Sequence, residues 1–111
     1  MEVYWKSAKL KSQLENEAHL IREYDIKVAQ SVAKRMKEIV SFPSYADLPP
    51  NANKHSIKNG NRLLYYAVDL PSLGSGRGKL RLTFEPYGEY DLANQKTVVS
   101  IKITGIEDYH H

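Results

Sequence analysis

The spacing of apolar residues changes near residue 42, and this change restricts the possible folds more than any other feature of the sequence. Between Ser7 and Glu23 apolar side chains recur every three or four positions, at Leu10, Leu14, Ala18 and Ile21. This period places them on one face of a helix. Beyond residue 62 the period is close to two, which is typical of strands. The chain is therefore expected to form helices first and a sheet afterwards.

A second helix is predicted to begin after Asp25, whose carboxylate can accept hydrogen bonds from the free amides of the first turn. Apolar side chains again share one face: Ile26, Ala29, Val32, Ala33, Met36, Ile39 and Val40. Phe42 precedes Pro43, and a residue before proline is pushed out of the α region, so the helix should end there. Because only Tyr24 and Asp25 separate the two helices, we expect an antiparallel helical hairpin.

Three strands are predicted in the second half of the chain, at Arg62–Leu70, Lys79–Glu85 and Thr97–Thr104. A weaker pattern indicates a strand at Glu2–Trp5. Residues 43–61 contain three prolines and four asparagines, which predict an ordered connection without periodic structure. The glycine-rich link at 71–78 is interpreted as a flexible hairpin loop, and the connection 86–96 is expected to hold a helical turn.

Helices followed by strands with short links favour the α+β class. We predict one domain, residues 1–111, in which the N-terminal helical hairpin packs on a small, mainly antiparallel sheet. The hairpin would cover one face of the sheet and leave the other face free for a concave site.

The composition excludes several classes of protein. The 111 residues include no cysteine, so a disulfide framework, a thiolate nucleophile and a cysteine-bound zinc are all excluded. No apolar run approaches the ~20 residues of a membrane span, and the N-terminus lacks a signal-peptide core. The sequence thus predicts a soluble cytoplasmic protein with no membrane partner. It offers no cluster of metal ligands, and neither a metal site nor a cofactor is expected.

Positive charge is concentrated in the middle of the chain. The net charge is only +3, but the segment Asn51–Arg81 holds six basic residues and a single acid, Asp69. The six are Lys54, Lys58, Arg62, Arg77, Lys79 and Arg81. A local basic surface indicates anion binding, with nucleic acid as the first candidate, although a solvated edge without a partner has the same composition.

Two short clusters combine side chains suited to acid–base chemistry. One is Lys54–Lys58, which contains His55, and the other is Asp108–His110, which follows the last predicted strand. Taken singly, the first is typical of a solvated loop and the second of a frayed tail. Ile106 and Tyr109 would anchor that tail.

These residues occur in a defined order along the chain. His55, Lys58 and Arg62 come first, Arg81-Leu82-Thr83-Phe84 follows in a strand, and Ile106-Glu107-Asp108-Tyr109-His110 comes last. This order, together with the preceding helical hairpin, resembles the HigB-type killer toxins of the RelE/ParE superfamily over essentially the whole chain. The resemblance implies a RelE-like fold and a type II toxin, an endoribonuclease that cuts messenger RNA on the ribosome. Its partner would be a small helix-turn-helix antitoxin.

The resemblance also assigns roles to particular residues. Its catalytic set falls on His55, Lys58, Asp108, Tyr109 and His110. Arg81 would be a further phosphate contact, and the RNA-binding surface would include Lys54, Arg62, Arg77 and Lys79. In such a reaction RNA supplies its own nucleophile, the 2′-hydroxyl, and no metal is needed. Histidines suit the proton transfers, and Lys58 and Arg81 suit the negative charge that develops on the phosphate.

Other interpretations stay open from the sequence. A non-catalytic toxin of the same superfamily would use the same fold to poison a protein such as DNA gyrase, without proton-transfer groups. A basic RNA-binding domain without activity would tolerate the loss of His110. For Arg81 the structural alternative is a strand charge with a cross-strand partner, and for Lys58 it is a solvated loop charge.

Overall fold

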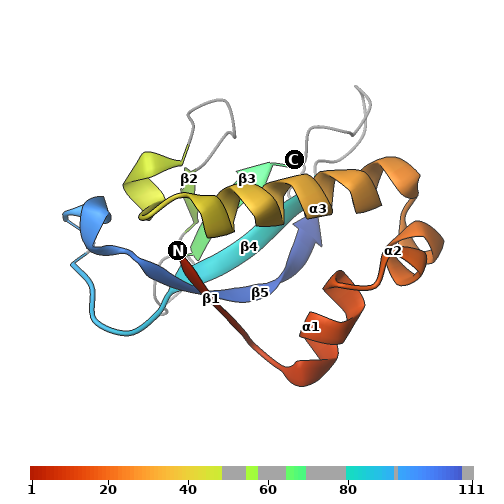
Figure 1. The fold of residues 1–111 in the computed structure, drawn as a ribbon, viewed down its shortest axis with the longest axis horizontal. Helices are drawn as coiled ribbons and strands as arrows, with labels where there is room; N and C mark the ends of the chain where they lie inside the picture. The colour runs from red at the N-terminus through yellow and green to blue at the C-terminus, as the bar shows by residue number, and fades with distance from the viewer. Residues whose placement is uncertain (49–54, 58–64, 70–79, 92, 109–111) are drawn as a thin grey trace.

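The described strands form one five-stranded sheet in the order β1-β5-β4-β3-β2. In this computed structural model they are β1 (Glu2–Trp5), β2 (His55–Ile57), β3 (Tyr65–Asp69), β4 (Leu80–Pro86) and β5 (Ser100–Asp108). The structure describes residues 1–48, 55–57, 65–69, 80–91 and 93–108 (Figure 1). β1 runs parallel to β5, and all other neighbours are antiparallel. The fold is therefore α+β with a mainly antiparallel sheet.

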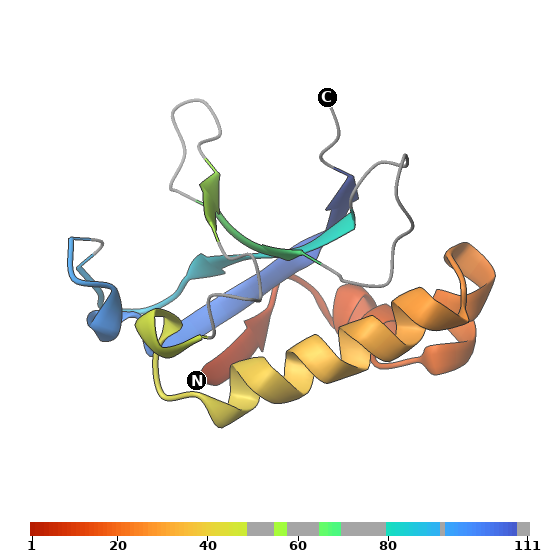
Figure 2. The ribbon, with the colours of Figure 1, turned by 90° about the horizontal axis from the view of Figure 1, so that it is seen from above.

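Three helices lie against one face of this sheet: α1 (Ala8–Leu14), α2 (Glu17–Glu23) and α3 (Ile26–Ser41). Figure 2 shows α3 crossing below the strands, with α1 and α2 on the same side. None of the described helices covers the opposite face, which we call the helix-free face. This arrangement agrees with the expectation that the helices occupy a single face.

The single helix predicted over residues 7–23 is wrong, because this segment forms two helices. A new helix starts after Asn16, whose side-chain oxygen accepts a hydrogen bond of 3.1 Å from the amide of His19. An N-cap of this kind begins a helix rather than continuing one. The break resets the helical phase, so Leu20 is buried whereas Ala18 and Ile21 are exposed. The continuous apolar stripe expected here is absent for that reason.

Both ends of α3 follow the sequence signals. The carboxylate of Asp25 accepts a hydrogen bond of 2.7 Å from the amide of Val28, which confirms it as the N-cap. The helix ends at Ser41, and Phe42 is extended, as a residue before proline should be. The start of β1 is tied to this end of the helix, because the amino group of Met1 donates hydrogen bonds to the carbonyls of Ile39, Val40 and Phe42.

The N-terminal strand is confirmed as β1, but its parallel pairing with the last strand was not predicted. The segment 43–61 is not a connection alone, because it contains a 3₁₀ turn at Tyr45–Asp47 and the strand β2. A strand of three residues is too short to show an alternating pattern, so the turn-rich composition conceals it.

The last strand begins and ends later than predicted. Residues Gln95–Thr97 form a 3₁₀ turn, in which the Asn94 side chain accepts a hydrogen bond from the amide of Lys96. This turn supplies the expected helical turn at the end of the connection and delays β5 to Ser100. β3 begins at Tyr65, and the flanking residues 62–64 and 70 of that predicted strand lie outside the described residues.

Apolar side chains of α3, β4 and β5 form the core. The strands contribute Leu82, Phe84, Ile101 and Ile103, which are fully buried. Helix α3 contributes the buried residues Val28, Val32 and Ile39. The ring of Tyr45 packs edge-on against that of Phe84, with 5.9 Å between the ring centres. Residues that alternate with these core positions in β4 and β5 belong to the helix-free face.

A β-bulge interrupts the pairing of β4 with β5. Thr83 pairs with Gly105, whereas its neighbour Phe84 pairs with Ile103. β5 therefore holds one residue more than β4 at this point. Because successive residues of a strand face opposite sides, the extra residue exchanges the two faces of β5 beyond the bulge. Ile106 packs against the core as a result.

Candidate functional site

The helix-free face carries polar and aromatic side chains from three neighbouring strands. Those described are Glu2 and Tyr4 of β1, Ser100, Lys102 and Thr104 of β5, Arg81, Thr83 and Glu85 of β4, and Tyr87 just after β4. Figure 2 shows the sheet curving away from α3, with β2 and the end of β5 rising on either side of this face. The concave side of the sheet is therefore the helix-free face, as expected from the sequence.

Three of the ten site residues predicted from the sequence lie in described strands. His55 begins β2, Arg81 lies in β4, and Asp108 ends β5. The others lie outside the described residues: Lys54, Lys58, Arg62, Arg77, Lys79, Tyr109 and His110. One sheet therefore holds the backbone of the first predicted catalytic residue, His55, and that of Asp108 near the end of the chain.

His55 belongs to a strand rather than to a loop, which corrects the sequence interpretation. It pairs with Ala67 of β3, and the same row continues through Thr83 of β4 to Gly105 of β5. In β4 this row alternates with the core position Phe84, so it belongs to the helix-free face. Strand pairing thus defines the backbone position of His55.

Asp108 lies across the sheet from His55. It pairs with Leu80 of β4, and two strands separate β5 from β2. Since neighbouring strands lie about 4.8 Å apart, β2 and β5 are roughly 14 Å apart across the sheet. The row of Asp108 alternates with that of Arg81, so by register it does not belong to the helix-free face.

Arg81 occupies a row that has an acidic residue on each neighbouring strand. Its backbone pairs with that of Asp69 in β3 and with that of Glu107 in β5. Directly opposed residues of a sheet share a face and lie about 5 Å apart. Arg81 is half-buried, and its Nε atom is enclosed by protein. The strand register thus gives Arg81 an acidic residue opposite it on each neighbouring strand. This is the arrangement expected if Arg81 is a strand charge with cross-strand partners rather than a phosphate contact.

A cluster that sequence reasoning missed lies at the other end of this face. The rings of Tyr4 and Tyr87 lie 4.4 Å apart with 33° between their planes. The ammonium group of Lys102 lies 5.8 Å from the centre of the Tyr87 ring and 2.9 Å from a carboxylate oxygen of Glu85. The Tyr4 hydroxyl donates a hydrogen bond of 3.0 Å to Glu2. We call these five residues the tyrosine cluster.

The only sequence signal for this cluster is the exposed side of the weak N-terminal strand, where Tyr4 alternates with Val3 and Trp5. Tyr87 is far away in the sequence, and only the parallel pairing of β1 with β5 brings the two rings together. The hydrogen bond to Glu2 changes the acidity of the Tyr4 hydroxyl. Its pKa is raised above that of a free tyrosine, first by the hydrogen bond to Glu2 and then by the negative charge of that carboxylate.

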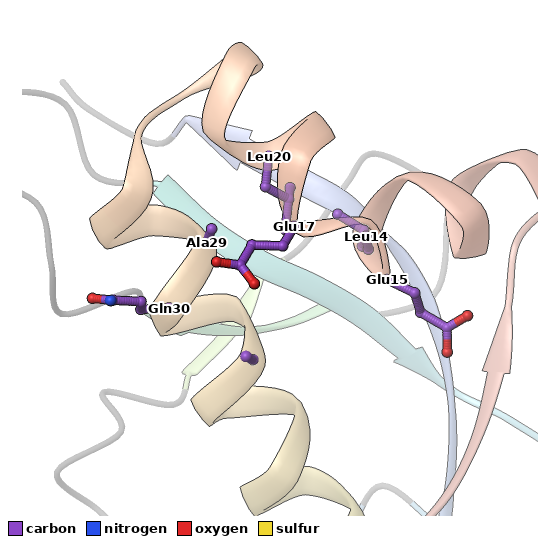
Figure 3. A pocket seen from close by; sticks show the side chains of 7 residues that line it. Leu14, Glu15, Glu17, Leu20, Ala29 and Gln30 are labelled. Atoms are coloured by element: carbon purple, nitrogen blue, oxygen red, sulfur yellow. The ribbon is translucent and has the colours of Figure 1, made fainter.

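A pocket of about 230 Å³ lies on the helical side of the molecule, between α3 and the α1–α2 segment (Figure 3). Leu14, Leu20 and Ala29 give it apolar walls, and Glu15 and Glu17 also line it. Its lining includes none of the three predicted site residues that the structure describes. The sheet separates this pocket from the helix-free face.

Within the described part of the chain, no group of three or more His, Asp or Glu side chains is placed to hold a metal ion. No helix described here is both long and apolar enough to cross a membrane. Comparisons of the chain with protein families, with curated proteins and with solved structures found no match.

Proposed function

We propose that this protein is the toxin of a type II toxin–antitoxin system, similar to the HigB-type toxins of the RelE/ParE superfamily. It would cut messenger RNA on the ribosome and be neutralised by a helix-turn-helix antitoxin. The observation that carries the proposal is the position of His55 in β2, in a row that continues through β3 and β4 on the curved helix-free face (Figure 2). A single RNA strand laid across β3 and β4 would follow this row to His55.

The proposed reaction uses a nucleophile that RNA itself carries. The 2′-oxygen attacks the adjacent phosphorus, and the bond from phosphorus to the 5′-oxygen breaks. The products are a 2′,3′-cyclic phosphate and a free 5′-hydroxyl. One protein group takes the proton of the 2′-hydroxyl, and another gives a proton to the leaving 5′-oxygen. His55 and His110 are suited to these transfers because histidine changes charge near neutral pH.

The remaining residues of the set would stabilise charge and position the RNA. Lys58 would place a positive charge beside the phosphorus as negative charge develops there. Asp108 would orient a histidine, and Tyr109 would stack on an unpaired base. The basic residues of the segment Asn51–Arg81 would hold neighbouring phosphates, so that RNA affinity falls as the salt concentration rises.

Primer extension on a translated messenger after brief induction tests the proposal. The wild type is expected to cut at in-frame positions, whereas His110→Ala should abolish these cuts and the growth inhibition. Loss of a proton-transfer group lowers a rate by on the order of 10²-fold or more. His19→Ala is the matched control and should cut like the wild type, because His19 lies in α2 on the helical side of the sheet.

Circular dichroism of both variants shows whether each one is folded. A folded His110→Ala protein that still cuts messenger RNA would remove His110 from the site. Growth arrest with an intact messenger would contradict the nuclease and favour the toxin that binds a protein target. A gyrase supercoiling assay would then test that alternative.

A further inference from the structure

We propose that the tyrosine cluster is a second RNA contact, a platform on which an unpaired base stacks at a distance from the cleaved bond. The inference rests on the proposed function, which makes RNA the ligand. It goes beyond that function because none of the five cluster residues belongs to the catalytic or phosphate-binding set that the resemblance implies.

The backbone of the sheet holds the two rings in place. Tyr4 lies directly opposite Lys102 in the parallel pairing of β1 with β5. The amide of Tyr87 donates a hydrogen bond of 3.0 Å to the carbonyl of Ser100, which extends the pairing of β4 with β5 beyond Pro86. The Tyr4 ring is held at its hydroxyl as well, through Glu2. A platform that is already ordered loses little entropy when it binds a ligand.

Both rings remain accessible although they contact each other. Tyr4 is 41% exposed and Tyr87 is 43% exposed. A base that stacks on this pair removes apolar area of both partners from water. Such stacking tolerates any sequence, because every base presents a π-face to an aromatic side chain.

The charged groups of the cluster, two carboxylates and one ammonium group, favour contact with a base rather than with the phosphate backbone. Lys102 balances Glu85 at a distance of 2.9 Å and adds a cation beside the Tyr87 ring. The Glu2 carboxylate accepts a hydrogen bond from Tyr4, and its remaining lone pairs can accept from the amino group of a base, as carboxylates do with cytosine. The platform should therefore prefer bases that carry an amino group over uracil.

Continuity with the candidate site favours RNA over a protein partner. The cluster and the row of His55 both belong to the helix-free face. Lys102 precedes Gly105, the β5 residue in the row of His55, by three positions, a span of roughly 10 Å at about 3.3 Å per residue. A single strand of a few nucleotides covers this span, so one RNA molecule would contact both the cluster and the row of His55.

Fluorescence anisotropy with a short, unstructured 2′-O-methyl RNA tests the platform, because the blocked 2′-oxygen prevents cleavage during the titration. Replacing both rings, in Tyr4→Ala/Tyr87→Ala, should weaken binding by roughly 5- to 150-fold, the equivalent of about 1–3 kcal/mol for one stacked base. Tyr87→Phe keeps the ring and should bind nearly as the wild type does. Tyr24→Ala is the matched control, because Tyr24 is 42% exposed but lies between α2 and α3.

Photocross-linking of the wild-type protein provides a measurement that does not depend on whether a variant folds. RNA that carries 5-iodocytidine should cross-link to Tyr4 or Tyr87, identified by mass spectrometry of the peptides. An RNA that carries 5-iodouridine at the same position should cross-link less.

The possible results separate the platform from the proposed function. Unchanged affinity in the folded double variant, or cross-links confined to other residues, would overturn the platform, while His110-dependent cutting would still support the nuclease. A wild type that binds no RNA would also overturn the platform. RNA binding through the cluster without in-frame cutting would support the platform and contradict the nuclease. Full RNA affinity combined with lost growth inhibition in the double variant would overturn the platform in favour of a protein contact.

Discussion

The hydroxyl oxygens of Thr83 and Thr104 lie 2.8 Å apart, beside the extra residue that β5 holds against β4. The Thr83 hydroxyl also donates a hydrogen bond of 3.0 Å to the carbonyl of Gly105, so its bond with Thr104 is one that it accepts. Thr83 is fully buried, and these bonds hold the bulge closed. Because the bulge sets the row of every later residue of β5, the position of Asp108 depends on this pair of threonines.

Thr83→Val keeps the shape of the side chain but removes both hydrogen bonds. The buried carbonyl of Gly105 then loses a donor, and the free energy of unfolding should fall by about 1–3 kcal/mol. Urea denaturation measures the loss. Thr104→Val is the control and should cost less, because the Thr83 hydroxyl keeps the hydrogen bond that it donates to Gly105. Equal stability of Thr83→Val and the wild type would show that the bulge does not need this hydroxyl.

Gly105→Ala tests the backbone of the same bulge. Gly105 has a φ of +150°, although a Cβ atom there would meet nothing within 4 Å. The cost is therefore conformational strain rather than a clash, and about 1–3 kcal/mol of stability should be lost. Chemical denaturation checks this value. An unchanged unfolding midpoint would mean that the bulge can rearrange around an L residue.

The positive charge of Arg81 should stabilise the sheet, because an acidic residue pairs with it on each neighbouring strand. Arg81→Met leaves Asp69 and Glu107 in one row without a cation between them, so the protein should lose stability. Adding Glu107→Gln to Arg81→Met should recover part of the loss, with a coupling energy of about 0.5–3 kcal/mol between the two sites. Urea denaturation of both single variants and of the double variant gives the coupling. Strict additivity would show that the two charges do not interact.

The raised pKa of Tyr4 provides a test of its contact with Glu2. The hydrogen bond favours the protonated hydroxyl, so its contribution to stability is present below the usual tyrosine pKa and is lost as the pH rises through the raised pKa. NMR titration of ¹³C-labelled tyrosine should show Tyr4 ionising at a higher pH than a free tyrosine. Glu2→Gln should lower the pKa of Tyr4 toward the usual value. No change in this variant would contradict the contact.

Local signals predicted α3 well and the first helical segment less well. Asp25 and the Phe42-Pro43 step act within one turn of the helix, so the sequence shows both ends of α3 directly. Asn16 is also a strong N-cap residue, but the apolar spacing around it suits one continuous helix equally well. Only packing against α3 decided that Leu20, rather than Ile21, became buried.

The sheet was less accessible to prediction because its pairing joins distant segments. β2 has three residues, too few for a pattern, and it forms because β3 offers an edge with which it pairs. β1 was visible as a weak strand, but nothing in Glu2–Trp5 specifies a parallel partner at the other end of the chain. The tyrosine cluster depends on that pairing and was missed with it.

The sequence by itself determined both ends of α3 and the residue types available for chemistry, because caps, proline and helical period act over a few neighbouring residues. Tertiary structure alone decided which of those residues share a face of the sheet. The bulge opposite Thr83 exchanges the faces of β5, and the parallel partner of β1 brings Tyr4 to Tyr87. Both depend on packing across the whole core, and the spacing of residues along one strand does not encode that packing.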